Sequence, residues 1–199
     1  MRLTNKIFES AGSIPPIVYW DNFFPENEIN IIREFCEKQP LEKGKIESDI
    51  ESDSVTEKIR KSEISFVNCS PETSWLFSRL NHMVEFFNTD FYRFNLVGFD
   101  HFQYTVYNDN CYYNYHTDMQ GPLYNGPITR KLSFSLILSD PSEYKGGEFE
   151  FFIDGNPVTF EQPKGRILAF PSYIMHRVNP VTEGVRKSIV VWAMGPRFV

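Results

Sequence analysis

Residues 132–153 read LSFSLILSDPSEYKGGEFEFFI and contain two strand-like segments joined by a polar turn. In Leu132–Leu138 and again in Gly147–Ile153, large apolar side chains alternate with small or polar ones. This period of two is typical of strands that bury one face. Asp140-Pro141-Ser142 and Gly146-Gly147 are turn signals. The stretch therefore predicts two short strands with a tight connection between them.

Similar segments continue on both sides of this stretch, separated by further turns such as Asp154–Pro157 and Pro163–Gly165. The other predicted strands are Phe99–Tyr107, Tyr112–Asp118, Val158–Phe160, Arg166–Phe170, His176–Val178 and Ser188–Trp192. Short strands at this spacing predict an all-β sandwich or barrel.

The region before residue 95 has helical patterns instead. Ile29, Ile32, Phe35 and Cys36 share one helical face, and this helix should end at Gln39-Pro40. A second helix is predicted to begin at Pro71, with an apolar face made of Trp75, Leu76, Leu80, Met83, Val84 and Phe87. We expect one domain over residues 1–199, in which residues 1–95 are a helical support packed on one sheet of a β core at 96–199.

Composition excludes several classes of protein. Lys and Arg total 20 against 26 Asp and Glu, so the net charge is −6, and no long basic tract is present for nucleic-acid binding. No apolar run reaches the roughly 18–20 residues of a membrane helix, and the first residues lack signal-peptide features. Cys36, Cys69 and Cys111 show no disulfide or zinc spacing. The sequence predicts a cytoplasmic protein that binds neither nucleic acid nor membrane.

Two loops are candidates for covering a site. Residues 41–58 are acidic and have few large apolar side chains, which predicts a solvated loop or, alternatively, a lid over a substrate. The second loop, Gln120–Thr129, comes just after His116-Thr117-Asp118 and is rich in Gly and Pro. We expect the two loops to close together over an extended peptide.

The chemistry of the chain centres on His116, Asp118 and His176. His116 and Asp118 are two apart, so on a strand they would project from the same face, and His176 in a later strand supplies a third donor. Two His and one carboxylate leave open positions on an octahedral metal, as in non-haem Fe(II) oxygenases, although zinc accepts the same donors. Arg186 adds a guanidinium that, inside a barrel, would require an anion such as a dicarboxylate; on the surface it would need none.

Three strings now carry a resemblance: YNYHTDM, RKLSFSLILSDPSEYKGGEFEF and FPSYIMHRVNPVTEGVRKSIVVW. They closely resemble the iron and 2-oxoglutarate-dependent dioxygenases of the prolyl 4-hydroxylase-like superfamily, in particular its small bacterial and phage members. The resemblance covers about residues 60–198. His-x-Asp alone has little specificity, but its combination with the FPS-x3-HRV-x-PV-x2-G-x-R string is specific.

The resemblance implies a double-stranded β-helix, or jelly roll, over residues 96–199, with Fe(II) held by His116, Asp118 and His176. Arg186, completing the catalytic set, would pair with the distal carboxylate of 2-oxoglutarate. We expect the Ser188 hydroxyl and Tyr107 to assist, with Tyr104 and Tyr113 as alternatives to Tyr107. A second tyrosine of some relatives is replaced here by Ile137 or Leu136.

The activity implied is hydroxylation of an unactivated C–H bond, coupled to conversion of 2-oxoglutarate and O2 into succinate and CO2. A peptidyl proline in a peptide or protein partner is the expected target. Another protein side chain, a free amino acid or another small molecule is the alternative. The family also makes L-ascorbate a candidate cofactor, and it places the protein in a bacterial or phage-infected cell.

Two other classes of protein compete with this interpretation. A non-catalytic jelly-roll binding module would have no use for an interior arginine beside a metal triad. A cupin-type isomerase or lyase would need three or more His ligands, and the chain offers only His82 and His101 as spares.

Overall fold

Strands dominate the fold that this sequence adopts. The computed structural model describes residues 2–4, 16–46, 58–119 and 126–198. All paired strands in these residues are antiparallel, and they form an eight-stranded sheet, a five-stranded sheet and a two-stranded ribbon. The larger sheet has the order β1 (Arg2–Thr4), β2 (Val18–Trp20), β12 (Ile167–Pro171), β8 (Ile128–Ile137), β15 (Arg186–Pro196), β6 (His101–Tyr107), β5 (Glu63–Asn68), β3 (Glu42–Lys43).

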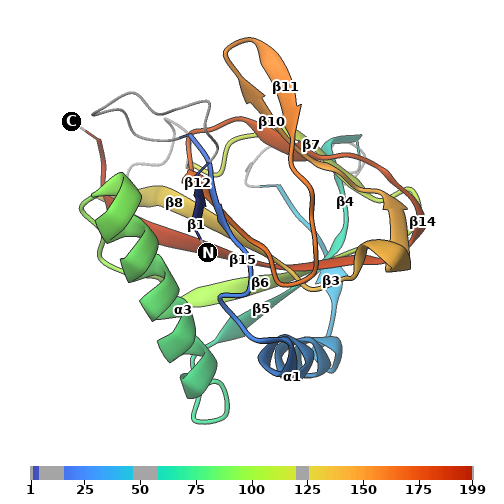
Figure 1. Cartoon of the computed structure of the whole chain (residues 1–199), viewed down its shortest axis with the longest axis horizontal. Helices are drawn as coiled ribbons and strands as arrows, with labels where there is room; N and C mark the ends of the chain where they lie inside the picture. Colours follow the sequence, from blue (N-terminus) through green and yellow to red (C-terminus); the bar gives the residue numbers. More distant parts are fainter. Residues whose placement is uncertain (1, 5–15, 47–57, 120–125, 199) are drawn as a thin grey trace.

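The smaller sheet faces the larger one, and a cluster of buried apolar side chains fills the space between them. Its order is β11 (Asn156–Thr159), β10 (Phe149–Ile153), β13 (His176–Val178), β7 (Tyr112–His116), β4 (Arg60–Lys61). The ribbon pairs β9 (Tyr144–Gly146) with β14 (Val181–Gly184). Figure 1 shows β7, β10 and β11 on one side of the long strands β6 and β15, and helices α1 (Glu26–Glu37) and α3 (Ser74–Phe87) on the other.

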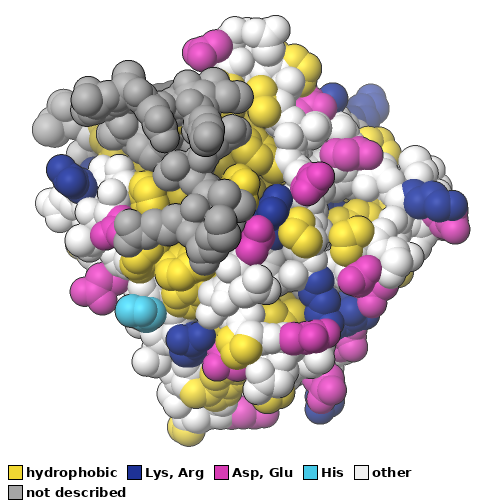
Figure 2. Space-filling model, in the orientation of Figure 1, with side chains coloured by type: hydrophobic (Ala, Val, Ile, Leu, Met, Phe, Trp, Pro, Cys, Tyr) yellow, Lys and Arg dark blue, Asp and Glu magenta, His cyan; other side chains and the backbone are white. Residues whose placement is uncertain are grey.

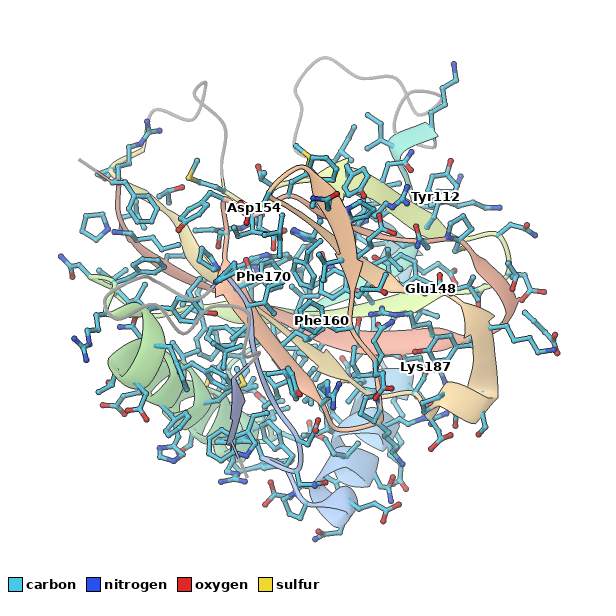
Figure 3. The ribbon with its side chains drawn as sticks, turned by 45° about the horizontal axis from the view of Figure 1, so that its top comes forward. Tyr112, Glu148, Asp154, Phe160, Phe170 and Lys187 are labelled. Carbon is cyan, nitrogen blue, oxygen red and sulfur yellow. The ribbon has the colours of Figure 1, made fainter. Side chains whose placement is uncertain are left out.

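The larger sheet packs apolar side chains on both of its faces. One face packs against side chains of helix α1 (Glu26–Glu37) and helix α3 (Ser74–Phe87). A short π-helix at Asn88–Tyr92 follows α3 directly. On β8 and β15 the helix-facing residues are Leu132, Phe134, Leu136, Ile189, Val191 and Ala193. The opposite face meets the smaller sheet, and Phe160 and Phe170, labelled in Figure 3, pack between the two sheets. The predicted mainly-β jelly roll with helices on one sheet is confirmed.

Each predicted strand is present, but several bounds differ. The segment predicted as Tyr112–Asp118 stops at His116, because the chain then turns and the backbone N–H of Met119 bonds to the carbonyl of Ser172 at 2.9 Å. β15 begins at Arg186, two residues earlier than predicted. β2 and β5 extend the larger sheet with residues from the N-terminal region, so this region contributes strands as well as helices.

The second helix begins three residues later than predicted. Ser70 and Thr73 close a turn first, with a 3.1 Å bond from the Thr73 N–H to the Ser70 carbonyl and a 3.0 Å contact between their hydroxyls. Such local bonds compete with helix formation, so α3 starts at Ser74. Trp75 was wrongly placed on the apolar face: it is exposed, while its neighbour Leu76 is buried.

Much of the two predicted covering loops lies outside the described residues, namely residues 47–57 and 120–125. Within the first loop, Glu42–Lys43 forms a short strand against β5. The prediction of a lid is therefore untested.

On the face drawn in Figure 2, basic side chains lie among acidic ones. No helix in the described part of the chain is long and apolar enough to cross a bilayer. Cys36, Cys69 and Cys111 are free thiols.

Phe134 tests the core that joins helix α3 to the larger sheet. Its ring lies 5.7 Å from that of Phe87, and it is buried. We expect Phe134→Ala to lower the free energy of unfolding by about 3–5 kcal/mol in denaturant titrations. The matched control Phe66→Ala, at a residue 45% exposed in the same sheet, should cost about 1 kcal/mol or less. Equal losses would contradict this division between core and surface.

Candidate metal and anion site

Three side chains of metal-ligand type meet at the inner face of the smaller sheet. His116 ends β7, His176 begins β13, and the two residues are paired across these strands. Asp118 lies beyond the end of β7, and its two carboxylate oxygens are each 3.7 Å from one histidine Nε2. The ligand atoms of the three residues all lie within 4.8 Å of one another, close to the separations of about 3–4 Å expected for donors that bind one ion at about 2.1 Å. The predicted triad is therefore brought together with a spacing that suits a metal ion.

Backbone carbonyls orient both histidines. His116 Nδ1 lies 2.8 Å from the Asn114 carbonyl, and His176 Nδ1 lies 2.9 Å from the Ile174 carbonyl. Because a carbonyl only accepts, each Nδ1 must carry the proton, and each Nε2 keeps its lone pair toward Asp118. A hydrogen bond from the second ring nitrogen to a carbonyl fixes the tautomer and the ring orientation of metal-binding histidines in proteins.

Burial prepares the triad for a cation. It lowers the pKa of His116 to about 3, aided by the neighbouring His176, so the imidazole stays neutral. Burial alone would raise the pKa of Asp118, but the two histidines and a hydrogen bond from Ser133 lower it below its usual range. A neutral imidazole and an ionised carboxylate are the forms that bind metal.

Aromatic rings enclose the two histidines. The rings of Phe170 and Phe149 lie 4.8 and 5.4 Å from that of His176. The ring of Tyr113 stacks on that of His116, with the ring centroids 3.5 Å apart. The Arg60 guanidinium lies over the Tyr113 ring, 4.6 Å from its centroid. These contacts restrict the imidazole planes.

Arg186 is a buried cation in a neutral cradle. It is 1% exposed, and burial lowers its pKa. Its Nε and Nη2 donate to Gln162 Oε1 at 3.1 and 2.7 Å, and Nη1 donates to the Ser188 hydroxyl at 3.3 Å. Tyr144 also hydrogen-bonds to it. Among the described residues, none of these partners is an anion, and a buried charge is costly until it is paired. The site therefore has a strong preference for an anionic ligand.

Of the three tyrosines that the sequence offers as candidates, Tyr107 is the one that lies beside Arg186. The guanidinium lies 5.5 Å from its ring centroid. Burial raises the pKa of Tyr107, and the charges of Arg186 and Asp118 act on it in opposite directions, so it lies near both parts of the site. Tyr104 belongs to the helix-side core, and Tyr113 stacks on His116.

Gly147 makes room for Arg186. It has φ +66°, and a Cβ there would lie 3.1 Å from Arg186 Cδ and 2.9 Å from Val181 Cγ2. The Gly146-Gly147 pair, which the sequence indicates as a turn, is thus also a packing requirement of the cradle.

Sequence reasoning missed Gln162 and Tyr144. Both are turn or strand-end residues that reach Arg186 through the tertiary fold, although Tyr144 lies within the quoted DPSEYKGGE string. Ile137 pairs with Ser188 across the sheet and Leu136 belongs to the helix-side core, so neither provides a polar group. His82 stacks near Phe23 and His101 pairs with Asp100, so neither joins the triad.

Comparison with known proteins matches residues 102–194 to the model of the 2OG-Fe(II) oxygenase superfamily. A PKHD-type hydroxylase of Picosynechococcus sp. is 38% identical over 86 residues, which are 43% of this chain and 38% of that protein. A PKHD-type hydroxylase of Synechococcus sp. is 35% identical over 89 residues, 42% of this chain and 40% of that protein. The chain thus spans less than half the length of these relatives.

Solved structures share the fold at low sequence identity. A prolyl-4-hydroxylase of Pseudomonas putida has a TM-score of 0.73 at 18% identity, over 92% of this chain and 94% of that one. A viral collagen prolyl hydroxylase of Paramecium Bursaria Chlorella virus-1, solved as a 2OG complex, has a TM-score of 0.70 at 17% identity, over 90% and 96%.

Gln162 provides a test of the neutral cradle. Gln162→Leu leaves two buried N–H groups of Arg186 without an acceptor, so we expect the free energy of unfolding to fall by about 1–3 kcal/mol. Gln162→Glu keeps the acceptor but loses the 3.3 Å bond that the Gln162 amide donates to the Gly147 carbonyl, so it should lose less stability than Gln162→Leu. Its carboxylate neutralises the guanidinium and should weaken binding of a dicarboxylate such as 2-oxoglutarate. Denaturant titration and calorimetry measure the two effects. Equal losses of stability in both variants would refute the role of Gln162.

Proposed function

Because residues 102–194 match the model of the 2OG-Fe(II) oxygenase superfamily, we propose that this chain is an Fe(II)- and 2-oxoglutarate-dependent dioxygenase that hydroxylates an unactivated C–H bond. One observation carries the proposal. A two-histidine, one-carboxylate triad with open positions shares an interior with a buried arginine that lacks an anionic partner in the described residues. The first suits Fe(II), and the second suits the distal carboxylate of 2-oxoglutarate.

His116, Asp118 and His176 would hold the metal. Bound Fe(II) would supply the activation of O2, with 2-oxoglutarate giving succinate and CO2 as coproducts. The protein prepares for this by keeping each histidine Nε2 unprotonated through its Nδ1 bond to a carbonyl. The carboxylate of Asp118, held ionised, offsets part of the metal charge.

Arg186 would bind the cosubstrate, assisted by Ser188 and Tyr107. Gln162 and Ser188 fix the plane of the guanidinium, so a carboxylate can meet it without reorganisation. Tyr107 lies near both Arg186 and Asp118, and burial keeps its hydroxyl protonated, so it can donate a hydrogen bond. These residues would orient the keto acid with its other end toward the triad.

Aromatic side chains would limit water at the reacting centre. Phe149, Phe151 and Phe170 pack around His176 between the sheets. An apolar wall of this kind protects reactive species from side reactions. We also propose that residues 96–199 are this core and that residues 1–95 are its supporting region.

A peptidyl proline is the proposed target. Support comes from the fold neighbours, which include prolyl hydroxylases, one of them from Trichoplax adhaerens in complex with a hypoxia inducible factor peptide fragment. Another protein side chain, a free amino acid or another small molecule is the alternative within the same chemistry. The cytoplasm of a bacterial or phage-infected cell stays a prediction, as does a requirement for ascorbate.

The test is turnover of the full chain with Fe(II), 2-oxoglutarate and O2, with and without ascorbate, on a panel of proline-containing peptides. The same peptides with proline replaced by alanine, and free amino acids, serve as controls. We expect succinate formation that proline peptides stimulate and a mass gain of one oxygen atom on proline, both lost in His176→Ala. Oxygen gained on another residue would move the target to the alternative. Absence of succinate from folded, iron-loaded protein would favour the non-catalytic binding module.

A further inference from the structure

Three polar side chains meet on the outer face of the smaller sheet, directly behind the two histidines. Tyr115 precedes His116 on β7, Arg177 follows His176 on β13, and Glu150 lies opposite Arg177 on β10. Strand alternation turns these three side chains away from the interior that His116 and His176 face. We call Tyr115, Glu150 and Arg177 the outer clasp.

Glu150 is the centre of the outer clasp. Its carboxylate accepts a short hydrogen bond from the Tyr115 hydroxyl. Its Oε1 also forms an ion pair with Arg177 Nη2 at 2.8 Å. The Arg177 guanidinium also stacks over the Tyr115 ring at 4.5 Å. Although it projects outward, Glu150 is only 7% exposed. The clasp is therefore a partly desolvated, charge-assisted link across three strands.

The outer clasp spans a register shift in the backbone ladder between β7 and β13. His116 pairs with His176, but the next pair is Tyr113 with Val178, so β7 uses three steps where β13 uses two. Asn114 and Tyr115 thus form a bulge in β7, where ladder hydrogen bonds are interrupted. Contacts between side chains therefore supplement the backbone ladder at this position.

The same bulge orients the metal ligand. The carbonyl that accepts from His116 Nδ1 belongs to Asn114, whose neighbour Tyr115 is held by Glu150. A shift of the bulge would move both this carbonyl and the backbone of His116. On the other side, Phe149 and Phe151 flank Glu150 in sequence and pack against the His176 ring. Glu150 is therefore linked to both histidines.

We propose that Tyr115, Glu150 and Arg177 are positioning residues that hold the β7 bulge and so set the metal affinity of the His116, Asp118, His176 site. The proposal rests on the metal site proposed above. Desolvation offsets much of the stability that a shielded ion pair gives, so the main effect of the clasp is on ligand geometry. Loss of one hydrogen bond of the clasp leaves all three metal ligands in place but fixes the orientation of the histidine rings less firmly.

The experiment titrates metal-free full-length protein with Co(II), whose visible d–d bands report coordination geometry. Tyr115→Phe removes only the hydroxyl that donates a hydrogen bond to Glu150. Glu150→Gln removes the negative charge of the clasp. Glu148→Gln is the matched control, because Glu148 (Figure 3) is exposed and lies two residues from Glu150. The free energy of unfolding of each metal-free variant is measured in parallel.

We expect both clasp variants to raise the Co(II) dissociation constant about threefold to tenfold and to change the d–d bands, because orienting partners of metal ligands have effects of about this size or larger. Glu148→Gln should match the wild type. Folded clasp variants with wild-type affinity and bands would overturn the clasp alone, and Tyr115→Phe decides if Glu150→Gln does not fold. Failure of the wild type to bind Co(II) would overturn the metal site and the clasp together.

Discussion

The alternation of β15 is the constraint on which the rest of the structure depends. Ile189, Val191 and Ala193 point from this strand into the helix-side core, while Arg186 and Ser188 point into the interior between the sheets. One strand thus supplies both the packing that holds the helices and the cation of the site. A slip of one residue would exchange the two faces, burying Lys187 and removing Arg186 from its cradle. The hydrophobic core therefore fixes the register of the site.

The cost of burying Arg186 determines what surrounds it. Gln162, Ser188 and Tyr144 satisfy its donors with neutral groups, and Gly147 leaves the space that its stem needs. A carboxylate partner from the chain would stabilise the cation more but would also occupy it. The neutral cradle keeps the positive charge available for an anionic ligand, which is the property that a dicarboxylate cosubstrate requires.

The two halves of the site have different mechanical supports. Arg186 begins β15, a central strand of the larger sheet that lies between β6 and β8, and it pairs with Tyr107 of β6. His116 and His176 stand on short strands of the smaller sheet, beside a bulge. The backbone ladder holds the first half, whereas side chains such as Tyr115 and Glu150 reinforce the second.

Local pattern predicted much of this arrangement. The strands, the triad and the interior position of Arg186 follow from alternation, residue chemistry and family resemblance. Asp118 shows the limit of spacing arguments: it joins His116 as expected, but from a turn after the strand rather than from the same face of it.

Contacts between distant segments could not be predicted. Gln162 reaches Arg186 from 24 residues away, and Glu150 reaches Tyr115 from 35. No periodicity relates such pairs, because the fold as a whole brings them together.

The most direct test of the central claim is anaerobic titration of the Fe(II)-loaded protein with 2-oxoglutarate, following the visible charge-transfer band of an Fe(II) keto-acid chelate. We predict the band in the wild type, its loss in His176→Ala, and a dissociation constant for 2-oxoglutarate at least about tenfold higher in Arg186→Ala, since a charge-assisted pair contributes about 1.5–3 kcal/mol. Absence of the band in folded wild-type protein, or unchanged affinity in Arg186→Ala, would contradict the account.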